Sequence, residues 1–236
     1  MPPAGRRVII TGAAGAIGTA IAAHLPGAWE LARTDLRAAD GLTVLDVTDL
    51  DACASMFTGA DAVVHLAGNP DPSASWADLH DPNLEGVRVV AVAAARAQVR
   101  RLVLASSLQA LSARPSREQL RAGDPPRPAN LYGATKAWAE AVGSWIAAST
   151  ATTVVALRIG YFSEARPGGA DDIPDNRAAW LSARDAAELV RAAVEGPVHD
   201  FTIVCGVSAN RHPKALAGSA ERVLGYRPID DAWAAG

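Results

Sequence analysis

The sequence predicts an α/β protein, with a doubly wound parallel sheet that carries helices on both faces. A β-branched run, a glycine-rich turn and an Ala-rich helical pattern follow one another within residues 7–25. Apolar strand patterns then alternate with helical patterns as far as residue 224, and neither a repeat nor a linker interrupts them. Such alternation implies right-handed crossovers between parallel strands. We therefore expect the 236 residues to form one domain, residues 1–236.

Composition narrows the possible partners. Half of the residues are hydrophobic but only 5% are aromatic, so the core must consist mainly of Ala, Val, Leu and Ile. A net charge of -3 gives no electrostatic reason to expect a nucleic acid or a membrane surface as partner. No apolar run approaches the roughly 18 residues that a membrane span needs. Cys53 and Cys205 are too few for a disulfide framework or a metal site, which indicates reduced thiols in a cytoplasmic protein.

The first strand and helix enclose three glycines. Residues 7–11 form the strand, and the helical pattern runs to Leu25. Gly12 permits a tight turn, Gly15 lets the backbone approach a pyrophosphate, and Gly18 allows close packing of helix on strand. The helix N-terminus adds unpaired N–H groups and a positive dipole. This context predicts a dinucleotide site, with contacts from Gly12, Ala14, Gly15, Ala16, Ile17 and Gly18.

The second strand, residues 29–34, ends at Asp35. A carboxylate about 20 residues beyond the glycine turn can accept hydrogen bonds from the ribose hydroxyls of a dinucleotide and repel a 2′-phosphate. Asp35 therefore favours NAD over NADP. Arg33 and Arg37 flank it and could instead hold a 2′-phosphate.

The next elements extend the same edge of the sheet. Residues 42–45 form a third strand that ends at Asp46 and Val47, placed to touch an adenine, and Thr48 or Asp49 caps the following helix. Residues 61–67 form a buried strand before a loop at 68–70. His65 within it is interpreted as a core histidine with its hydrogen bonds satisfied, because no second metal-ligand residue lies at suitable spacing. Residues 71–81 read as an access loop and short helix, with Ser73 and Ser75 as candidate pocket residues.

The remaining chain continues the alternation. A helix at 83–99 precedes a strand at 101–105, which ends at Ser106 and Ser107. Hydroxyls at the carboxyl end of a parallel strand point toward a ligand site, although Ser-Ser is also ordinary turn chemistry. We expect a surface excursion at 114–129 and then a helix from Tyr132 to about 148. A strand at 152–159 and an irregular segment at 160–179 should follow. The chain should end with a helix at 182–194 capped by Ser182, a strand at 200–205 and a helix at 212–224.

Tyr132 and Lys136 stand four residues apart, on one face of the predicted helix. Lys136 is one of only two lysines in a chain that otherwise uses arginine. A lysine ammonium beside a phenol favours the phenolate, so it could lower the tyrosine pKa from about 10 toward 7 and create a base. Taken alone, this pair is more often a structural Tyr and an exposed Lys; the glycine turn favours the chemical interpretation.

Together these motifs resemble the extended short-chain dehydrogenase/reductases of the NAD-dependent epimerase/dehydratase family. Residues 65–68 (HLAG), 83–86 (NLEG), 158–160 (RIG) and 206–210 (GVSAN) are most similar to the uronate dehydrogenase subgroup. The resemblance implies a Rossmann-type fold and a small C-terminal substrate-binding portion formed by residues 160–182 and 206–236. Further cofactor contacts implied are Asp46, Val47, Leu66, Ala67, Gly68, Asn83, Ala105, Tyr132, Lys136 and Ile159.

The resemblance also implies catalytic roles. Tyr132 would be the base, Lys136 would hold the nicotinamide ribose and keep the phenol acidic, and Ser107 would bond the reacting oxygen. Two positions depart from the subgroup: Leu108 and Gln109 replace an Asn-His pair that contacts the sugar. Arg177 is the nearest counterpart of the arginine that holds the uronate carboxylate, or else a solvated loop residue. The candidate substrate-binding residues are Ser73, Ser75, Ser107, Leu108, Gln109 and Arg177.

The favoured function is hydride transfer between NAD and a hydroxyl of a small, uronic acid-like substrate. Because Leu108 is apolar, a ketoreductase or epimerase/dehydratase with a less polar substrate is the alternative, and an NAD(P)-binding sensor without chemistry is a third. No metal is expected. The family implies a homodimer, through the helices that start near Asn130 and Ser182.

Overall fold

The computed structural model describes residues 5–115 and 118–234, and a seven-stranded parallel sheet lies at its centre. The strand order is β3-β2-β1-β4-β5-β6-β9. The chain thus winds outward from β1 in one direction and from β4 in the other, which confirms the doubly wound sheet and is the Rossmann arrangement. The strands are β1 (Arg7–Thr11), β2 (Glu30–Asp35), β3 (Thr43–Val44), β4 (Ala62–His65), β5 (Arg101–Ser107), β6 (Thr153–Ile159) and β9 (Phe201–Gly206).

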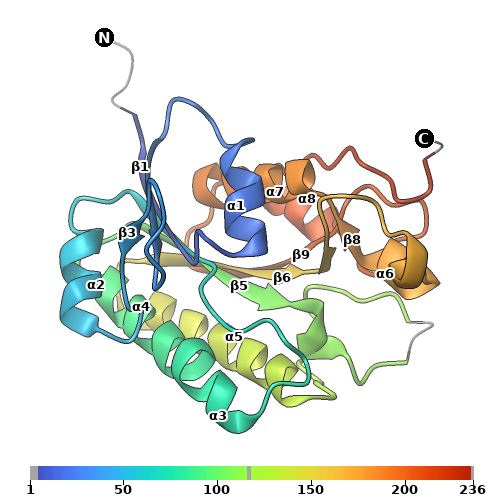
Figure 1. Ribbon diagram of the computed structural model, residues 1–236, viewed down its shortest axis with the longest axis horizontal. Coiled ribbons are helices and arrows are strands. Elements are labelled where there is room, and N and C mark those ends of the chain that lie inside the picture. The colour runs from blue at the N-terminus through green and yellow to red at the C-terminus, as the bar shows by residue number, and fades with distance from the viewer. Residues whose placement is uncertain (1–4, 116–117, 235–236) are drawn as a thin grey trace.

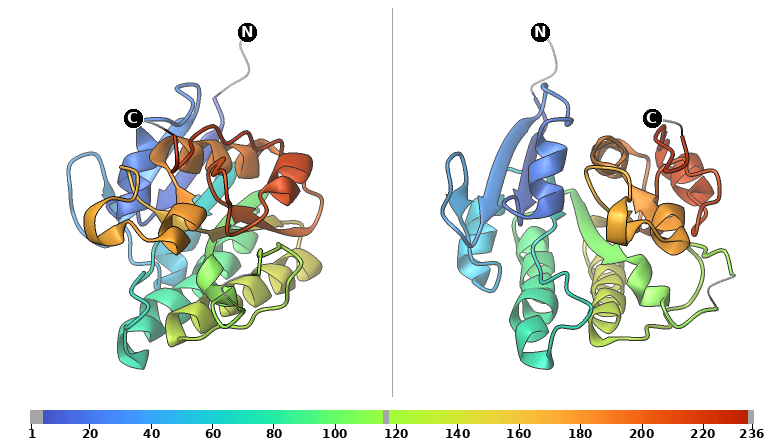
Figure 2. Two further views of the ribbon diagram at one scale, coloured as in Figure 1. Left: turned by 90° about the vertical axis from the view of Figure 1, so that its right-hand side faces the viewer. Right: turned by 45° about the vertical axis from the view of Figure 1, so that its right-hand side comes forward.

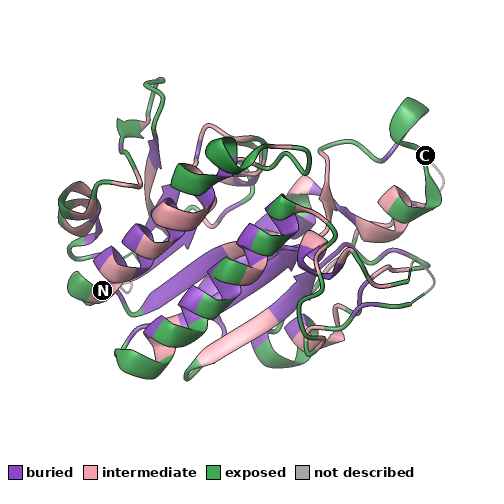
Figure 3. Cartoon of the chain, turned by 90° about the horizontal axis from the view of Figure 1, so that it is seen from below, coloured by how far each residue is buried: buried purple, intermediate pink, exposed green. Residues whose placement is uncertain are grey.

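Two layers of helices cover the sheet (Figures 1 and 2). One layer holds α1 (Ala16–Ala22), α7 (Ala183–Glu195) and α8 (Gly218–Leu224), and the other holds α2 (Leu50–Phe57), α4 (Gly86–Arg96) and α5 (Leu131–Ser149). Each layer forms its own hydrophobic cluster with one face of the sheet, rich in Ala and Val as the composition predicts. Figure 3 views the layer of α4 and α5 from below and shows buried and exposed residues alternating along its helices.

Short polar side chains fix where the main helices begin. Asp49 accepts a hydrogen bond from the Ala52 N–H at α2. Asn130 accepts one from the Gly133 N–H at α5, and Ser182 one from Asp185 at α7. These caps satisfy N–H groups that have no partner within the first helical turn, and they confirm the predicted helix starts.

The helix predicted at 83–99 is wrong in its bounds. A short helix α3 (Trp76–Leu79) leads into a π-helix (His80–Glu85), and α4 occupies only Gly86–Arg96. Pro82 has no N–H to donate, so a regular α-helical ladder cannot pass through it. The π-helix, whose turns are wider than those of an α-helix, leads the chain from α3 into α4.

Two further predictions are corrected in the substrate portion. The segment expected to be irregular contains β7 (Tyr161–Phe162), which pairs with β8 (Trp180–Leu181), as well as a 3-10 helix (Gly169–Asp171) and α6 (Pro174–Ala179). The helix predicted at 212–224 covers only α8. The residues before it lie extended beside Leu120, whose N–H donates to the Lys214 carbonyl (2.9 Å) and whose carbonyl accepts from Leu216.

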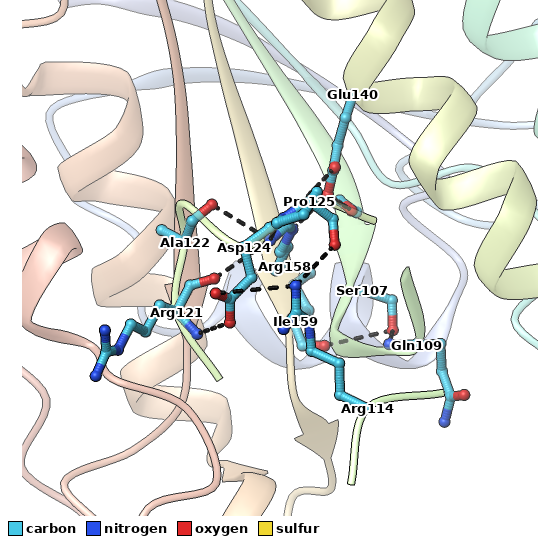
Figure 4. A network of polar contacts seen from close by, with 11 residues as sticks. Ser107, Gln109, Arg114, Arg121, Ala122, Asp124, Pro125, Glu140, Arg158 and Ile159 are labelled. Atoms are coloured by element: carbon cyan, nitrogen blue, oxygen red, sulfur yellow. Dashed lines mark hydrogen bonds and ion pairs between the residues drawn. The ribbon is translucent and has the colours of Figure 1, made fainter. Parts of the chain in front are cut away.

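The segment predicted as a surface excursion, 114–129, is anchored to the core by Arg158 where it is described; residues 116–117 lie outside the described chain. Arg158 is fully buried, and its Nε and Nη2 donate to the two carboxylate oxygens of Glu140 on α5 at 2.7 and 2.8 Å. Ser106 donates to the same carboxylate at 2.6 Å. The Arg158 Nη1 reaches the excursion itself (Figure 4), donating to the carbonyls of Arg121, Ala122 and Asp124. A 3-10 helix (Leu108–Leu111) lies between the end of β5 and this excursion.

We predict that Glu140→Gln lowers the free energy of unfolding by about 3–5 kcal/mol, because it leaves the buried Arg158 charge uncompensated. Urea unfolding measures this. Glu85→Gln is the matched control, since Glu85 and Arg88 form a half-exposed pair whose loss should cost less than about 1 kcal/mol. Equal losses in the two variants would contradict the role assigned to the buried pair.

Candidate functional site

Two cavities open at the carboxyl ends of the strands, with volumes of about 690 and 550 Å³. Leu66, Gly68 and Asn69 line both of them, so the two form one continuous crevice. The crevice lies where the winding direction of the sheet reverses, between β1 and β4, which is the place where open parallel sheets bind ligands.

The smaller cavity is built around the glycine turn. Gly12 has a φ of +72°, and a Cβ there would lie 2.4 Å from the Ala67 nitrogen, so only glycine fits. Gly15 also lines this cavity, whereas Gly18 does not. A Cβ on Gly18 would lie 2.6 Å from the Gly12 carbonyl oxygen, and this third glycine therefore serves the close packing of α1. Other predicted residues on this wall are Asp46, Val47 and Ala67.

Asp35 closes the far side of the smaller cavity at the end of β2. Its Oδ2 accepts a hydrogen bond from the Ala14 N–H (3.0 Å), and its Oδ1 accepts one from the Arg37 N–H (3.1 Å). Ala14 lines neither cavity; it orients Asp35. Of the two flanking arginines, Arg37 lines the cavity with an exposed side chain, while Arg33 extends toward the Gly41 carbonyl.

The larger cavity holds the three residues predicted to be catalytic. Tyr132 and Lys136 are nearly buried, and the Lys136 Nζ donates to the Ala105 carbonyl at 2.9 Å. A hydrogen bond joins Ser107 to the Tyr132 phenol. A Cβ on Gly133 would lie 2.3 Å from the Gln109 carbonyl oxygen, so this glycine lets α5 approach the end of β5 and places Tyr132 beside Ser107. Predicted cofactor residues on the same wall are Ala16, Ile17, Leu66, Gly68, Ala105 and Ile159.

Asn83 lines neither cavity but fixes the loop between them. Its Oδ1 accepts a hydrogen bond from the Asn69 N–H at 2.7 Å, and its Nδ2 donates to the Asn69 carbonyl at 2.9 Å. The same Nδ2 reaches Thr135 on α5. Asn83 therefore ties the shared loop to the helix that carries Tyr132.

The prediction that Lys136 lowers the pKa of the Tyr132 phenol is wrong for this geometry. Burial raises the pKa of the Tyr132 phenol, and only the hydrogen bond with Ser107 acts to lower it. The ammonium stands over the tyrosine ring, 5.4 Å from its centre, and donates to the Ala105 carbonyl. Burial also lowers the pKa of Lys136 itself to about 8, because the site disfavours its charged form.

The prediction that His65 has all its hydrogen bonds satisfied is wrong. Its Nδ1 is hydrogen-bonded to the Thr11 hydroxyl at 2.8 Å, but its buried Nε2 has no partner among the described residues. Burial, with a further contribution from Lys136, lowers the pKa of His65 to about 3. The imidazole is therefore neutral beneath the site and leaves Lys136 as the positive charge there.

The predicted substrate residues divide into two groups. Leu108 and Gln109 line the larger cavity. Ser73, Ser75 and Arg177 do not: Ser73 bonds Asp71 at 2.7 Å, Ser75 caps α3, and Arg177 pairs with Asp172. The wall also contains residues that the sequence analysis missed, namely Ser112, Arg114, Leu120, Tyr161, Phe162, Asp175, Asn176 and Lys214. The rarity of lysine was a signal that could have identified Lys214.

Other kinds of site receive no support within residues 5–115 and 118–234. Three or more His, Cys, Asp or Glu side chains do not come together there in a metal-binding group. Among the same residues, none of the helices has the length and apolar character required to cross a membrane.

Comparison with known proteins agrees with this geometry. Residues 8–170 match the model of the NAD dependent epimerase/dehydratase family. The chain belongs to this family. It is 34% identical to an L-arabinose 1-dehydrogenase (NAD(P)(+)) of Haloferax volcanii, over 95% of this chain and 97% of that protein. It is also 34% identical to an NAD-dependent glucose-6-phosphate dehydrogenase of the same organism, over 95% and 93% of the two chains.

A solved structure of a uronate dehydrogenase shares this fold over nearly the whole chain. Uronate dehydrogenase from Agrobacterium tumefaciens, as a mutant complexed with NAD, superposes with a TM-score of 0.86 at 27% identity, covering 96% of this chain and 86% of that one. The named relatives are dehydrogenases, and this chain is an enzyme of the same family.

We predict that His65 makes the protein less stable in acid. Its pKa of about 3 lies below the ordinary 6.5, so between these values the unfolded chain binds a proton that the native protein does not. The stabilisation is complete above pH 6.5 and falls by about 1.4 kcal/mol per pH unit below it. Denaturant unfolding from pH 7.5 to 4.5 should therefore show a steeper decline for the wild type than for His65→Asn. Exposed His80→Asn is the control; parallel curves for wild type and His65→Asn would refute the prediction.

Proposed function

We propose that this enzyme is an NAD-dependent dehydrogenase that oxidises the anomeric hydroxyl of a monosaccharide or sugar acid to a lactone. One observation carries the proposal: Ser107, Tyr132 and Lys136 line a cavity continuous with the crevice of Gly12, Gly15 and Asp35. The relatives, an L-arabinose 1-dehydrogenase, an NAD-dependent glucose-6-phosphate dehydrogenase and a uronate dehydrogenase, support oxidation of a sugar or sugar derivative.

The crevice suits NAD. Gly12 and Gly15 leave its floor without side chains. The Asp35 Oδ2 accepts from the Ala14 N–H, and its Oδ1 accepts from the Arg37 N–H and, at 3.5 Å, from the Arg37 Nε, so the carboxylate retains lone pairs for ribose hydroxyls. The Asp35 carboxylate also repels a 2′-phosphate.

We predict that the preference for NAD over NADP, measured as the ratio of kcat/KM values, falls at least about tenfold in Asp35→Ala. An unchanged ratio would remove Asp35 from cofactor selection.

The three cavity residues divide the proton chemistry. Ser107 donates a hydrogen bond to the reacting hydroxyl oxygen and orients it, and the Tyr132 oxygen removes the hydroxyl proton. NAD, when bound, supplies the acceptor for the hydride that leaves the same carbon. The Lys136 ammonium would hold the nicotinamide ribose. Because burial raises the pKa of Tyr132, the phenol is protonated at neutral pH, and oxidation is favoured in alkaline solution.

We predict that Tyr132→Phe lowers kcat by about 10²–10⁴-fold, the usual contribution of a general base, and leaves the Kd for NAD within about twofold. NADH absorbance with L-arabinose, D-glucose 6-phosphate, D-glucuronate and D-galacturonate gives the rate, and calorimetry gives the Kd. Tyr226→Phe is the control, because this phenol is buried far along the chain against the Val207 carbonyl. Full turnover by Tyr132→Phe would favour a non-catalytic, NAD-binding role instead.

A second candidate is a ketoreductase or epimerase/dehydratase that acts on a less polar intermediate. Leu108, Leu111 and Leu120 give the larger cavity an apolar flank where a sugar-binding site would place polar groups. The substrate-selecting walls would then be residues 160–182 and the described part of 206–236, together with 108–115 and 118–120. A screen that detects turnover of apolar ketones, and of none of the sugars, would establish this alternative.

We also propose a homodimer formed through α5. Its outward-facing residues carry no charge over the whole helix: Leu131, Ala134, Ala137, Trp138, Ala141, Ser144, Trp145 and Ala148. By contrast, the outward face of α7 carries Arg184, Glu188, Arg191 and Glu195, which argues against the second helix expected at the interface. A contiguous exposed apolar stripe is typical of a protein interface.

Sedimentation tests the assembly. The wild type should sediment as a dimer, and Trp145→Glu should sediment as a monomer that keeps the circular dichroism spectrum of the folded protein. A monomeric wild type would refute the α5 interface.

We propose a cytoplasmic location as well, because Cys53 and Cys205 are both buried free thiols. Recovery of the native enzyme in a secreted fraction would contradict this location.

A further inference from the structure

Gln109 is fixed at all but one of its polar atoms, just beyond the end of β5. Its N–H donates to the Ser107 hydroxyl at 3.1 Å (Figure 4), and its carbonyl accepts from the Ser112 N–H at 3.2 Å. Its Oε1 accepts a hydrogen bond from the Asn130 Nδ2 at 3.1 Å. Within residues 5–115 and 118–234 its Nε2 has no partner, so two hydrogens remain to be donated. Gln109 lines the larger cavity, and Asn130 does not.

Asn130 decides which end of the Gln109 amide is left for the cavity. The oxygen and nitrogen ends of an amide have nearly the same shape, so their hydrogen bonds set the orientation. The Gly133 N–H at the start of α5 can only donate, and the Asn130 oxygen therefore faces it, at 2.7 Å. The Asn130 nitrogen then faces Gln109 and can also only donate, which turns the Gln109 oxygen toward it. The nitrogen end of Gln109 is thus available to a bound molecule.

We propose that Asn130 is a positioning residue, which through Gln109 presents a hydrogen-bond donor to a substrate oxygen other than the reacting one. Ser107 and Tyr132 bind the reacting oxygen in the proposed reaction. Because the Gln109 N–H bonds the Ser107 hydroxyl, the donor lies beside that reacting centre. This role rests on the proposed dehydrogenase function and adds two residues that select its substrate.

The wall around Gln109 makes this donor important. Leu108 and Leu111 belong to the same 3-10 helix and line the same cavity, but their side chains have nothing to donate. A substrate oxygen placed against them keeps a hydrogen bond only through a neighbouring donor. A pinned amide also loses less rotational freedom on binding than a free one. Asn130 therefore strengthens substrate binding without contacting the substrate.

Two substitutions separate the amide from the helix cap. Gln109→Met keeps an unbranched side chain and removes the amide. Asn130→Ser keeps an oxygen that can cap α5, because Ser and Asn are equally good at this position, but it has no nitrogen to hold Gln109. Asp49→Ser, the same kind of exchange at the start of α2, is the matched control, since Asp49 lies outside both cavity linings.

Binding and turnover are both measured. The probes are L-arabinose, D-glucose 6-phosphate and D-glucuronate, with KM and kcat from NADH absorbance and Kd from calorimetry on the NADH-loaded protein. Gln109→Met should raise KM and Kd about 3- to 10-fold, the range for one neutral hydrogen bond, with kcat within about twofold. Asn130→Ser should raise both about 2- to 5-fold, because it frees the amide. The double variant should match Gln109→Met, and Asp49→Ser should match the wild type.

A purely structural role for Asn130 predicts a different result. Loss of the α5 start would disturb Lys136, raise the Kd for NAD and lower the unfolding midpoint. Asn130→Ser should instead leave the unfolding midpoint unchanged and the Kd for NAD within about twofold. A loss of NAD affinity as large as the loss of sugar affinity would reduce Asn130 to a helix cap and overturn the inference.

The outcomes separate the inference from the function. If sugars are oxidised but Gln109→Met leaves KM unchanged, or the two substitutions multiply in the double variant, the positioning role is wrong and the dehydrogenase stands. If sugars bind with a Kd that depends on Gln109 and Asn130 but none of them is oxidised, the positioning role stands and the proposed function is wrong. If none of the sugars binds or reacts, both are wrong.

Discussion

The pairing of Arg158 with Glu140 is the interaction on which the relative positions of β6, α5, the end of β5 and residues 121–124 depend. It is fully buried, and it joins the end of β6 to the middle of α5. Through Ser106 it also reaches the end of β5, and through Nη1 it holds the backbone at 121–124. A buried charge requires several donors or acceptors around it, and here Arg158, Glu140 and their partners come from four segments, namely β6, α5, β5 and residues 121–124. The need to satisfy one guanidinium therefore determines how helix, sheet and excursion fit together.

The packing around Arg158 and Glu140 also positions Tyr132 and Lys136. Lys136 and Glu140 lie one helical turn apart on the buried face of α5, so the ion pair sets the rotation of the helix that carries Tyr132 and Lys136. At the start of the same helix, Gly133 packs directly on the Gln109 carbonyl. At the end of β6, Gly160 is equally close to its neighbour, since a Cβ there would lie 2.0 Å from the Ala179 carbonyl oxygen. Close backbone contacts at these points bring three strand ends to the wall of one cavity.

Burial then sets the electrostatics of this cavity more strongly than the neighbouring charges do. It lowers the pKa of both Lys136 and His65 and raises that of Tyr132. The three shifts share one cause, because each neutral form needs less hydration than the charged form. A neutral His65 beneath Lys136 leaves the Lys136 ammonium as the positive charge at this end of the cavity.

The sequence by itself determined the sheet, the glycine turn and the residues at the strand ends, because these depend on local periodicity and on glycine's lack of a Cβ. It determined the helix start at Ser182 for the same reason, since capping is a contact within one turn, and it left Thr48 and Asp49 as alternatives, of which the structure selects Asp49. Only the tertiary structure decided that Ser73, Ser75 and Arg177 face away from the cavity and that Arg114 and Lys214 face into it. It also decided the pKa of Tyr132. Those properties depend on burial and on contacts between residues tens of positions apart, which local sequence pattern does not encode.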